Sequence, residues 1–186
     1  ASIMTYGFNP KVAKWSPFHG GMYAVIESIA KVVAMGGDHK KVRLTFQEYF
    51  EKLEEDEKKW GKPFSALLGA YYVQKKFNVP SVGGKDSMSG TFNDLNVPPT
   101  LISFAVGVSK ASKIVSPEFK KRGSFVVLVP SIVDEMGMPD FEKMDESFSR
   151  IHELIESGKV LAARTVTTGG IAQGISEMAF GNKIGF

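Results

Sequence analysis

Two kinds of apolar pattern alternate along the chain and predict an α+β fold with α/β character, in which mixed sheets are flanked by helices. Apolar residues recur at helical spacing over residues 20–34 and 141–156. Runs rich in strand formers cover residues 101–109, 125–129 and 160–166. With 186 residues, 43% hydrophobic and 23% charged, the composition is typical of one globular domain or two small ones.

The first part of the chain is predicted to be mainly helical. The helix over 20–34 stops at Gly36-Gly37, which is a good C-terminal signal. Residues 42–44 alternate like a short strand. The next helix is predicted over 45–59, with its threonine as the cap, and a further helix over 63–77 begins at a proline.

Extended structure is predicted on both sides of a polar turn in the middle of the chain. Residues 87–92 and 101–109 have strand composition, and we expect them to be antiparallel neighbours. A boundary is predicted over 112–123, where Ser116-Pro117 and a basic turn separate two apolar patterns.

Strands and helices alternate in the last part of the chain. A strand over 125–129 is closed by a proline, and the helix over 141–156 ends at Gly158. Residues 160–166 form another predicted strand. The last predicted helix, over 169–179, opens at Gly169-Gly170.

The segment Pro80–Phe92 is the most informative one for function. It gathers Gly83, Gly84, Lys85, Asp86, Ser87 and Ser89 in what we expect to be one short turn. Glycines let the backbone approach a ligand, lysine neutralises an anion, and a carboxylate with hydroxyls can hold a divalent ion or orient phosphate oxygens. The Walker pattern is not met, because no glycine stands five residues before Gly84 and Lys85 precedes an aspartate. The segment therefore predicts either a phosphate site of another type or a surface hairpin turned by its glycines.

Several further blocks occur in the order of one known family. With them, the chain resembles phosphoribosylformylglycinamidine synthase (FGAM synthase) in its large single-chain form, over nearly its whole length. The blocks are Phe18-His19-Gly20-Gly21, Trp60-Gly61-Lys62-Pro63-Phe64, Gly84-Lys85-Asp86-Ser87-Met88-Ser89, Val97-Pro98-Pro99-Thr100, Ile114-Val115-Ser116-Pro117 and Gly169-Gly170-Ile171-Ala172-Gln173.

The resemblance implies a pair of A and B domains similar to those of aminoimidazole ribonucleotide synthetase. Residues 1–112 correspond to the later part of the second A domain, and residues 113–186 to the earlier part of the second B domain. The implied partners are the N-terminal synthetase-like unit and the glutaminase domain of the same polypeptide, together with a small-molecule nucleotide. On this interpretation the chain is a piece of a larger enzyme, has no catalytic residue of its own and is inactive in isolation.

The chemistry implied by the resemblance is that of an ATP-dependent carbon–nitrogen ligase of purine biosynthesis. The family amidates formylglycinamide ribonucleotide with glutamine-derived ammonia, and its cofactors are ATP or ADP and Mg²⁺. The substrate amide oxygen is phosphorylated, and ammonia then displaces the phosphate. Such a reaction depends on fixed donors around the developing phosphate charge.

Transferred residue by residue, the resemblance places nucleotide or phosphate contacts in three parts of the chain and one metal ligand at Glu27. The contacts are Gly83, Gly84, Lys85, Asp86, Ser87 and Ser89 in the glycine segment, Thr167, Gly169 and Gly170 at a helix start, and His19 at a helix entrance. The family asparagine one turn after Glu27 is Lys31 here, and the family Asp-x-Ser falls on Thr165 and Thr167. Because a hard divalent ion prefers anionic and carbonyl oxygens, these changes argue against the auxiliary magnesium site of the family.

Each of these residues also has a structural interpretation. His19 can cap or pack, Gly169-Gly170 can permit close helix packing, and Glu27 can be a surface carboxylate. A hypothesis from a different class is a non-catalytic scaffold module with a vestigial nucleotide site. A free-standing enzyme similar to aminoimidazole ribonucleotide synthetase is disfavoured, because the opening strands of its A domain are not found.

The composition of the chain bears on which kinds of partner it binds and on its cellular compartment. A net charge of +3, with basic runs beside acidic or apolar residues, does not predict a nucleic-acid partner. The lack of cysteine excludes disulfides and thiol catalysis. We find no signal peptide and no apolar run long enough to span a membrane. We therefore expect a cytoplasmic protein without a membrane partner. Trp15 and Trp60 are expected in a core or an interface. Unpaired strand edges predict a possible homodimer.

Overall fold

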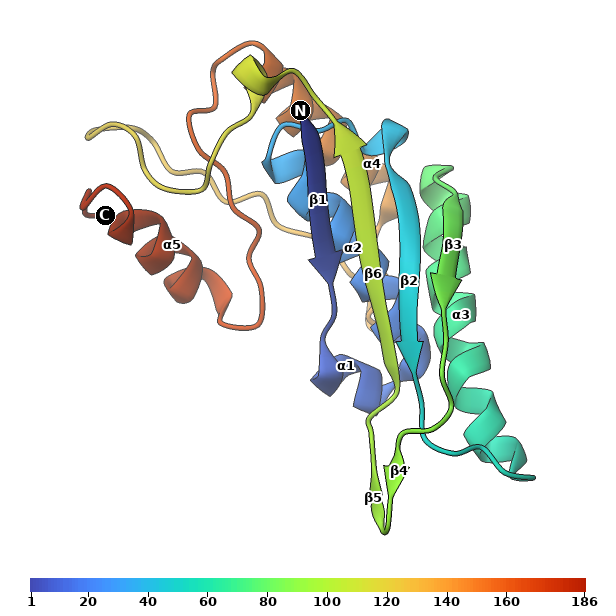
Figure 1. Cartoon of the computed structure of the whole chain (residues 1–186). Coiled ribbons are helices and arrows are strands. Elements are labelled where there is room, and N and C mark those ends of the chain that lie inside the picture. Colours follow the sequence, from blue (N-terminus) through green and yellow to red (C-terminus); the bar gives the residue numbers. More distant parts are fainter. The chain divides into compact units, whose positions relative to one another are not determined.

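The computed structural model describes all 186 residues, which divide into two compact units. Residues 4–29 and 40–106 form what we call the sheet unit. Residues 1–3, 30–39 and 107–186 form the second unit. Figure 1 shows the order of the helices and strands along the chain.

A four-stranded mixed sheet is the centre of the sheet unit. The strand order is β1 (Ser2–Gly7), β6 (Thr100–Val108), β2 (Arg43–Tyr49) and β3 (Ser81–Lys85). β2 runs antiparallel to β6 and parallel to β3. Buried residues alternate with more exposed ones along β2 and β6, so one face of the sheet is covered.

The N-terminal strand β1 and the helix α1 (Pro10–Trp15) were not predicted from the sequence. A local signal marks the start of α1, because the side-chain oxygen of Asn9 accepts from Lys11 N at 3.0 Å and Val12 N at 3.3 Å. Two short 3₁₀ helices, His39–Lys41 and Ala111–Lys113, complete the helical elements of the first two-thirds of the chain.

Helix α2 (Pro17–Ala34) confirms the helix predicted over residues 20–34 and lies behind the sheet in Figure 1. The hydroxyl oxygens of Ser28 and Ser103 are 2.9 Å apart and link α2 to β6. The chain leaves this helix through Gly36, whose φ of +97° suits glycine. The apolar residues buried along α2 include Met22, Val25, Ile29 and Val32.

Helix α3 (Glu57–Phe77) connects β2 to β3 and crosses α2 at close range. A Cβ on Gly21 would lie 2.1 Å from the carbonyl oxygen of Ala66, so this approach requires glycine. The predicted helix end near Phe77 is confirmed. Its predicted start at Pro63 is wrong, because Asp56 caps the helix by accepting from Lys58 N at 2.9 Å and Pro63 lies inside it.

The helix predicted over residues 45–59 is wrong, because most of its first half forms β2. The buried residues Leu44, Phe46 and Glu48 alternate along that strand. Short apolar patterns fit helix and strand periods alike, so the sequence pattern did not separate the two. Hydrogen bonding to β6 on one side and β3 on the other decides for the strand.

A small local hairpin replaces a predicted long-range pairing. β4 (Thr91–Phe92) pairs with β5 (Leu95–Asn96), so the pairing predicted between residues 87–92 and 101–109 is wrong. Asn93 between them has a φ of +53°, the left-handed conformation that a tight two-residue turn requires. Because this hairpin is closed locally, β6 pairs with β1 and β2 instead.

The second unit contains two predicted helices. α4 (Phe141–Glu156) has the predicted bounds: Asp140 caps it by accepting from Lys143 N at 3.1 Å, and Gly158 follows it with a φ of +73°. α5 (Gly170–Phe180) confirms the helix predicted after Gly169-Gly170. The buried residues of α4 are Phe141, Met144, Phe148 and Ile155.

Two predicted strands of the second unit are not strands. Residues 125–129 and 160–166 are irregular and pair with no strand of either sheet. Phe125 is 99% exposed. An apolar, strand-forming composition produces a strand only where a neighbouring strand takes up its backbone hydrogen bonds, and none does so here.

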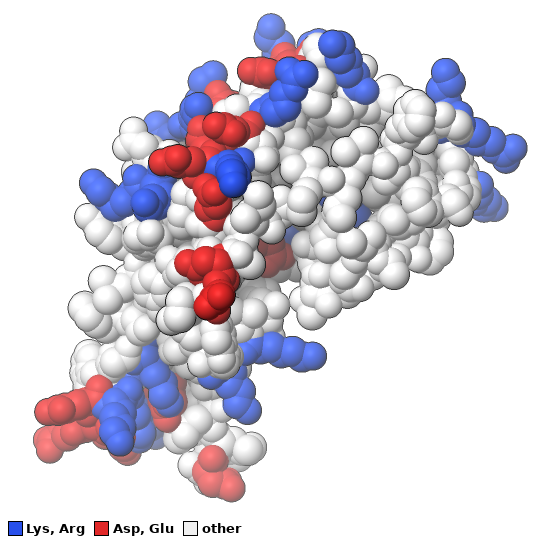
Figure 2. All heavy atoms as spheres, turned by 180° about the vertical axis from the view of Figure 1, so that it is seen from behind, with Lys and Arg blue, Asp and Glu red and all other residues white.

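The surface carries charges of both signs. Figure 2 shows acidic side chains next to basic ones on the left of the face seen from behind, with a broad uncharged area beside them. At the start of α3, Lys59 Nζ lies 2.7 Å from Glu54 Oε2. Trp15 and Trp60 are 70% and 57% exposed, so they do not lie in the core of this chain, and their alternative place in an interface stays a prediction. None of the helices combines the length and the apolar character needed to cross a bilayer.

Candidate phosphate-binding site

The glycines of the predicted phosphate segment lie in an edge strand. Gly83, Gly84 and Lys85 belong to β3 and not to the tight turn that the sequence analysis predicted. Gly84 pairs with Phe46 and Lys85 with Gln47, and this ladder with β2 holds the segment extended. Every residue of β3 is exposed. An edge strand leaves one row of backbone N–H and C=O groups open, so β3 can offer its backbone to a ligand.

The two glycines differ in the space around them. A Cβ on Gly84 would lie 2.8 Å from the carbonyl oxygen of Phe46, whereas a Cβ on Gly83 would meet nothing within 4 Å. Thr45 Oγ1 also donates to the carbonyl oxygen of Gly83 at 3.1 Å. The packing of β3 against β2 therefore requires glycine at position 84 and leaves position 83 open.

The serines follow β3 directly. Ser87 N donates to the carbonyl oxygen of Glu48 at 3.2 Å, and Phe50 N donates to that of Ser87 at 2.9 Å. These two bonds extend the parallel ladder and place Asp86 opposite Glu48. The hydroxyl oxygens of Ser87 and Ser89 are 2.8 Å apart, so the structure brings both hydroxyls together beside the end of the strand.

Lys85 and Asp86 are exposed, and neither side chain makes an ion pair or a hydrogen bond within the chain. Lys59, which is half-buried, has an acidic partner in Glu54. A lysine without an acidic partner, next to open backbone groups and hydroxyls, is suited to neutralise a bound phosphate.

Glu48 is the residue of this site that the sequence analysis missed. It is 7% exposed and its carboxylate has no hydrogen-bond partner in the chain. Burial, and then the negative charge of Asp86, raise the pKa of Glu48 from 4.5 to about 7. The available signal was the alternation of Leu44, Phe46 and Glu48, which places a carboxyl group on the apolar face once the segment is read as a strand.

His19 lies near the start of α2. Its Nδ1 is 2.8 Å from Ser16 Oγ, and its ring centroid is 4.9 Å from that of Trp15 and 5.5 Å from that of Phe18. These contacts agree with a capping and packing role. Contact between His19 and an anion stays a prediction.

Glu27 does not stand in an acidic cluster. Its Oε2 accepts from Phe8 N at 3.3 Å, and Lys31 follows one helical turn later. The chain contains no group of three or more His, Cys, Asp or Glu side chains arranged to hold a metal ion. Glu27 as a metal ligand stays a prediction.

The third set of predicted contacts lies in the second unit, at the N-terminus of α5. Gly170 N donates to the carbonyl oxygen of Thr167 at 2.8 Å, and Gly170 has a φ of +71°. Gly169 caps the helix without a side-chain hydrogen bond. The first backbone N–H groups of a helix lack intrahelical partners and attract anions. This set belongs to the second unit, whereas the glycine segment belongs to the sheet unit.

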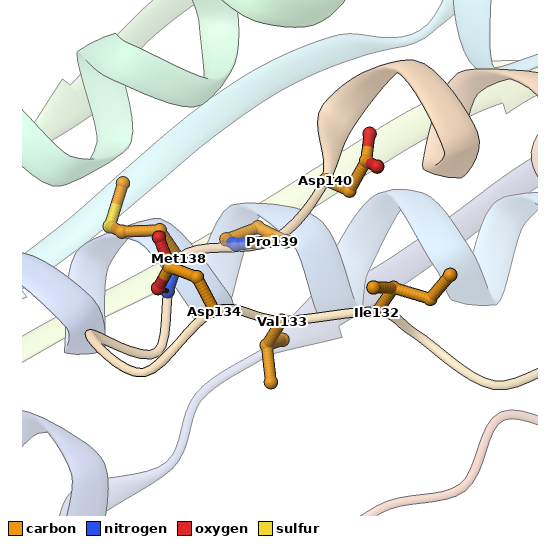
Figure 3. A pocket seen from close by; sticks show the side chains of 6 residues that line it. All are labelled: Ile132, Val133, Asp134, Met138, Pro139 and Asp140. Carbon is orange, nitrogen blue, oxygen red and sulfur yellow. Dashed lines mark hydrogen bonds between the residues drawn. The ribbon is translucent and has the colours of Figure 1, made fainter.

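A hollow of about 290 Å³ in the second unit carries no comparable chemistry. Figure 3 shows its lining, in which Asp140 stands at the start of α4. Asp134 Oδ1 accepts from Met136 N and Met138 N, both at 2.9 Å, and Asp140 caps α4. Both carboxylates are thus engaged by the backbone, and no cation lines the hollow.

Solved structures with similar coordinates define the fold. The PurL of Thermotoga maritima complexed with FGAR is similar with a TM-score of 0.71 and 18% identity, over 97% of this chain and 32% of that one. The same protein complexed with ATP is similar with a TM-score of 0.60 and 20% identity, over 84% and 24%. The predicted α+β fold of the aminoimidazole ribonucleotide synthetase type is confirmed.

The sequence comparison is more specific. The chain is 25% identical, over 208 aligned positions, to the phosphoribosylformylglycinamidine synthase subunit PurL of Thermoplasma volcanium, and the match covers 99% of this chain and 26% of that protein. The resemblance to FGAM synthase is confirmed, because relatives about 25% identical over nearly the whole chain are PurL proteins. It spans about a quarter of the length of the curated relatives that it matches. No family model matches it.

Proposed function

We propose that the chain forms part of an FGAM synthase, the ATP-dependent carbon–nitrogen ligase that amidates formylglycinamide ribonucleotide with glutamine-derived ammonia. Similarity to PurL over 99% of the chain supports this proposal. So do the complexes of Thermotoga maritima PurL with ATP and with FGAR. The observation that carries the site is Lys85, a cation without an acidic partner, at the end of a glycine strand whose outer backbone edge is open.

In this proposal the segment Gly83–Ser89 binds and orients a phosphate group. Lys85 supplies the positive charge, and the hydroxyls of Ser87 and Ser89 donate to phosphate oxygens. Asp86 stands beside them as an oxygen donor for a cation. Mg²⁺ bound with the nucleotide would neutralise phosphate charge in the reaction.

The rest of the enzyme is part of the proposal as well. Residues 1–112 and 113–186 are assigned to the second A and B domains, and their partners are an N-terminal synthetase-like unit and a glutaminase domain of the same polypeptide. The 186-residue chain alone is expected to be inactive, since its relatives are about four times as long. We place the enzyme in the cytoplasm, and we expect the open edge of β3 to favour a homodimer of the isolated chain.

The test is Lys85→Ala in the polypeptide that carries this chain. Loss of a charge-assisted hydrogen bond, worth roughly 1.5–3 kcal/mol, corresponds to a loss of about tenfold to a hundredfold in nucleotide affinity. ATP binding is measured by calorimetry, and FGAM formation is measured with glutamine and with ammonia. Lys75→Ala is the matched control, because Lys75 is an exposed lysine in the last turn of α3.

A second candidate function is a non-catalytic scaffold module. Lys31, Thr165 and Thr167 favour it, because they replace the oxygen ligands expected at the auxiliary metal site. Unchanged ATP affinity and turnover in Lys85→Ala would decide for the scaffold.

A further inference from the structure

Two carboxylates stand opposite each other where β2 and β3 end. The ladder continues past Lys85, because Ser87 N donates to the carbonyl oxygen of Glu48 and Phe50 N donates to that of Ser87, at 3.2 Å and 2.9 Å. This continuation makes Asp86 the neighbour of Glu48 across the two strands. Paired residues of neighbouring strands project to the same face of a sheet, so both carboxylates lie on one face.

No protein cation offsets this pair. Like charges directly opposite each other destabilise a sheet. Glu48 is more than nine-tenths buried, at 7% exposure, and neither Glu48 nor Asp86 has an ion-pair or hydrogen-bond partner for its side chain. Lys85 comes from the same strand end, but adjacent strand residues point to opposite faces, so its charge projects away from the pair.

The next buried acid along the chain, Glu51, shows how a buried carboxylate is normally compensated by a cation. Glu51 is 5% exposed and forms an ion pair with Lys62 Nζ. A buried carboxylate is normally paired in this way, because an uncompensated buried charge is costly. Glu48 lies three residues earlier in the chain, is buried to nearly the same extent, and has an acid beside it in place of a lysine.

We propose that Glu48 and Asp86 together bind a divalent cation of the Mg²⁺ type. Such a cation prefers carboxylate oxygens and is commonly held by one or two carboxylates, with waters and phosphate oxygens in the remaining positions. Cation binding stands independently of the ligase activity, and only its contact with a phosphate rests on the proposed function.

The test uses Mn²⁺ alone as the probe, because it accepts the same oxygen ligands and its free form is measured by electron paramagnetic resonance. Loss of a supporting ligand commonly weakens metal binding about 10–100-fold, so Glu48→Gln and Asp86→Asn should each weaken Mn²⁺ binding at least about tenfold. Mg²⁺ should compete. Paramagnetic broadening of amide signals should centre on Phe50 and Ser87.

Asp94→Asn is the matched control, because Asp94 is an exposed acid in the hairpin turn of the same unit. It should leave Mn²⁺ affinity unchanged. Circular dichroism should show all three variants folded, since each removes only a charge. Equal affinity of Glu48→Gln and the unmodified chain would overturn the proposal, as would no binding at millimolar Mn²⁺ or broadening centred on residues 54–56.

Failure of this proposal and failure of the proposed function give different results. If Lys85→Ala weakens ATP binding while Glu48→Gln and Asp86→Asn leave Mn²⁺ affinity unchanged, the cation site is wrong and the phosphate segment stands. If Mn²⁺ binds the acid pair while Lys85→Ala leaves ATP affinity unchanged, the cation site stands and the phosphate segment is wrong.

Discussion

The two candidate phosphate sites lie on different kinds of structural element: one on an edge strand of a sheet, the other at the start of an exposed helix. The segment 83–89 continues a strand that hydrogen-bonds to β2, whose neighbour on the other side is β6. The N-terminus of α5 stands on a helix without a single buried residue. The backbone of an edge strand is held by its hydrogen bonds to the neighbouring strand, whereas the first turn of an exposed helix depends on local hydrogen bonds. The first site is therefore the better ordered of the two before any ligand binds.

The largest expected effect concerns the pH dependence of stability in the sheet unit. The pKa of Glu48 is raised from 4.5 to about 7, so between these values the folded chain holds a proton that the unfolded chain has lost. Stability should therefore fall as the pH rises through this window and level off above it. One pKa unit corresponds to about 1.4 kcal/mol, so the total fall is roughly 3–4 kcal/mol.

Urea unfolding at a series of pH values, with a chelator present, measures this fall. Glu48→Gln should remove this contribution, whereas Asp94→Asn should retain it. If the stability of the unmodified chain and that of Glu48→Gln change in parallel with pH, the pKa of Glu48 is not raised by folding. The sheet unit would then lack the buried carboxyl group that distinguishes the segment 83–89 from the α5 site.

The next effect compares the two glycines of β3. Gly84→Val forces a side chain against the carbonyl oxygen of Phe46, where a Cβ would lie only 2.8 Å away. Overpacking of this kind costs about 1–3 kcal/mol. Gly83→Val introduces the same side chain into open space and should change stability by no more than about 0.5 kcal/mol.

Urea midpoints of the two valine variants provide the measurement. Equal midpoints would mean that β3 does not pack closely on β2 at position 84. The phosphate segment would then be no better supported than the helix start in the second unit.

The smallest effect concerns the α5 site. Gly170 has a φ of +71°, so Gly170→Ala should destabilise the helix start by about 1–2 kcal/mol. Gly174 lies within the helix, and a Cβ there would meet nothing within 4 Å. Gly174→Ala should therefore stabilise the helix by about 0.8–1 kcal/mol. Amide hydrogen exchange along α5 should move in opposite directions for the two variants, and a shift in the same direction would contradict the left-handed turn at Gly170.

The sequence alone determined the helices that have local signals. α2, α4 and α5 could be predicted because apolar stripes, caps and terminal glycines lie within a few residues of the elements they define. It also identified Lys85, Asp86 and the two serines as chemically suited to a phosphate, because their residue types carry that information wherever the chain places them.

The strand predicted over residues 101–109 is confirmed as β6, but only the tertiary structure decided the other strands and the acid pair. Residues 43–49 became a strand and residues 125–129 did not, because a strand depends on partners that are distant in sequence. The same non-local pairing made the glycine segment an edge strand and set the register that places Asp86 opposite Glu48. The alternation along β2 is a local signal for the burial of Glu48, but its pairing with Asp86 follows from the register, so no local pattern could have revealed the pair.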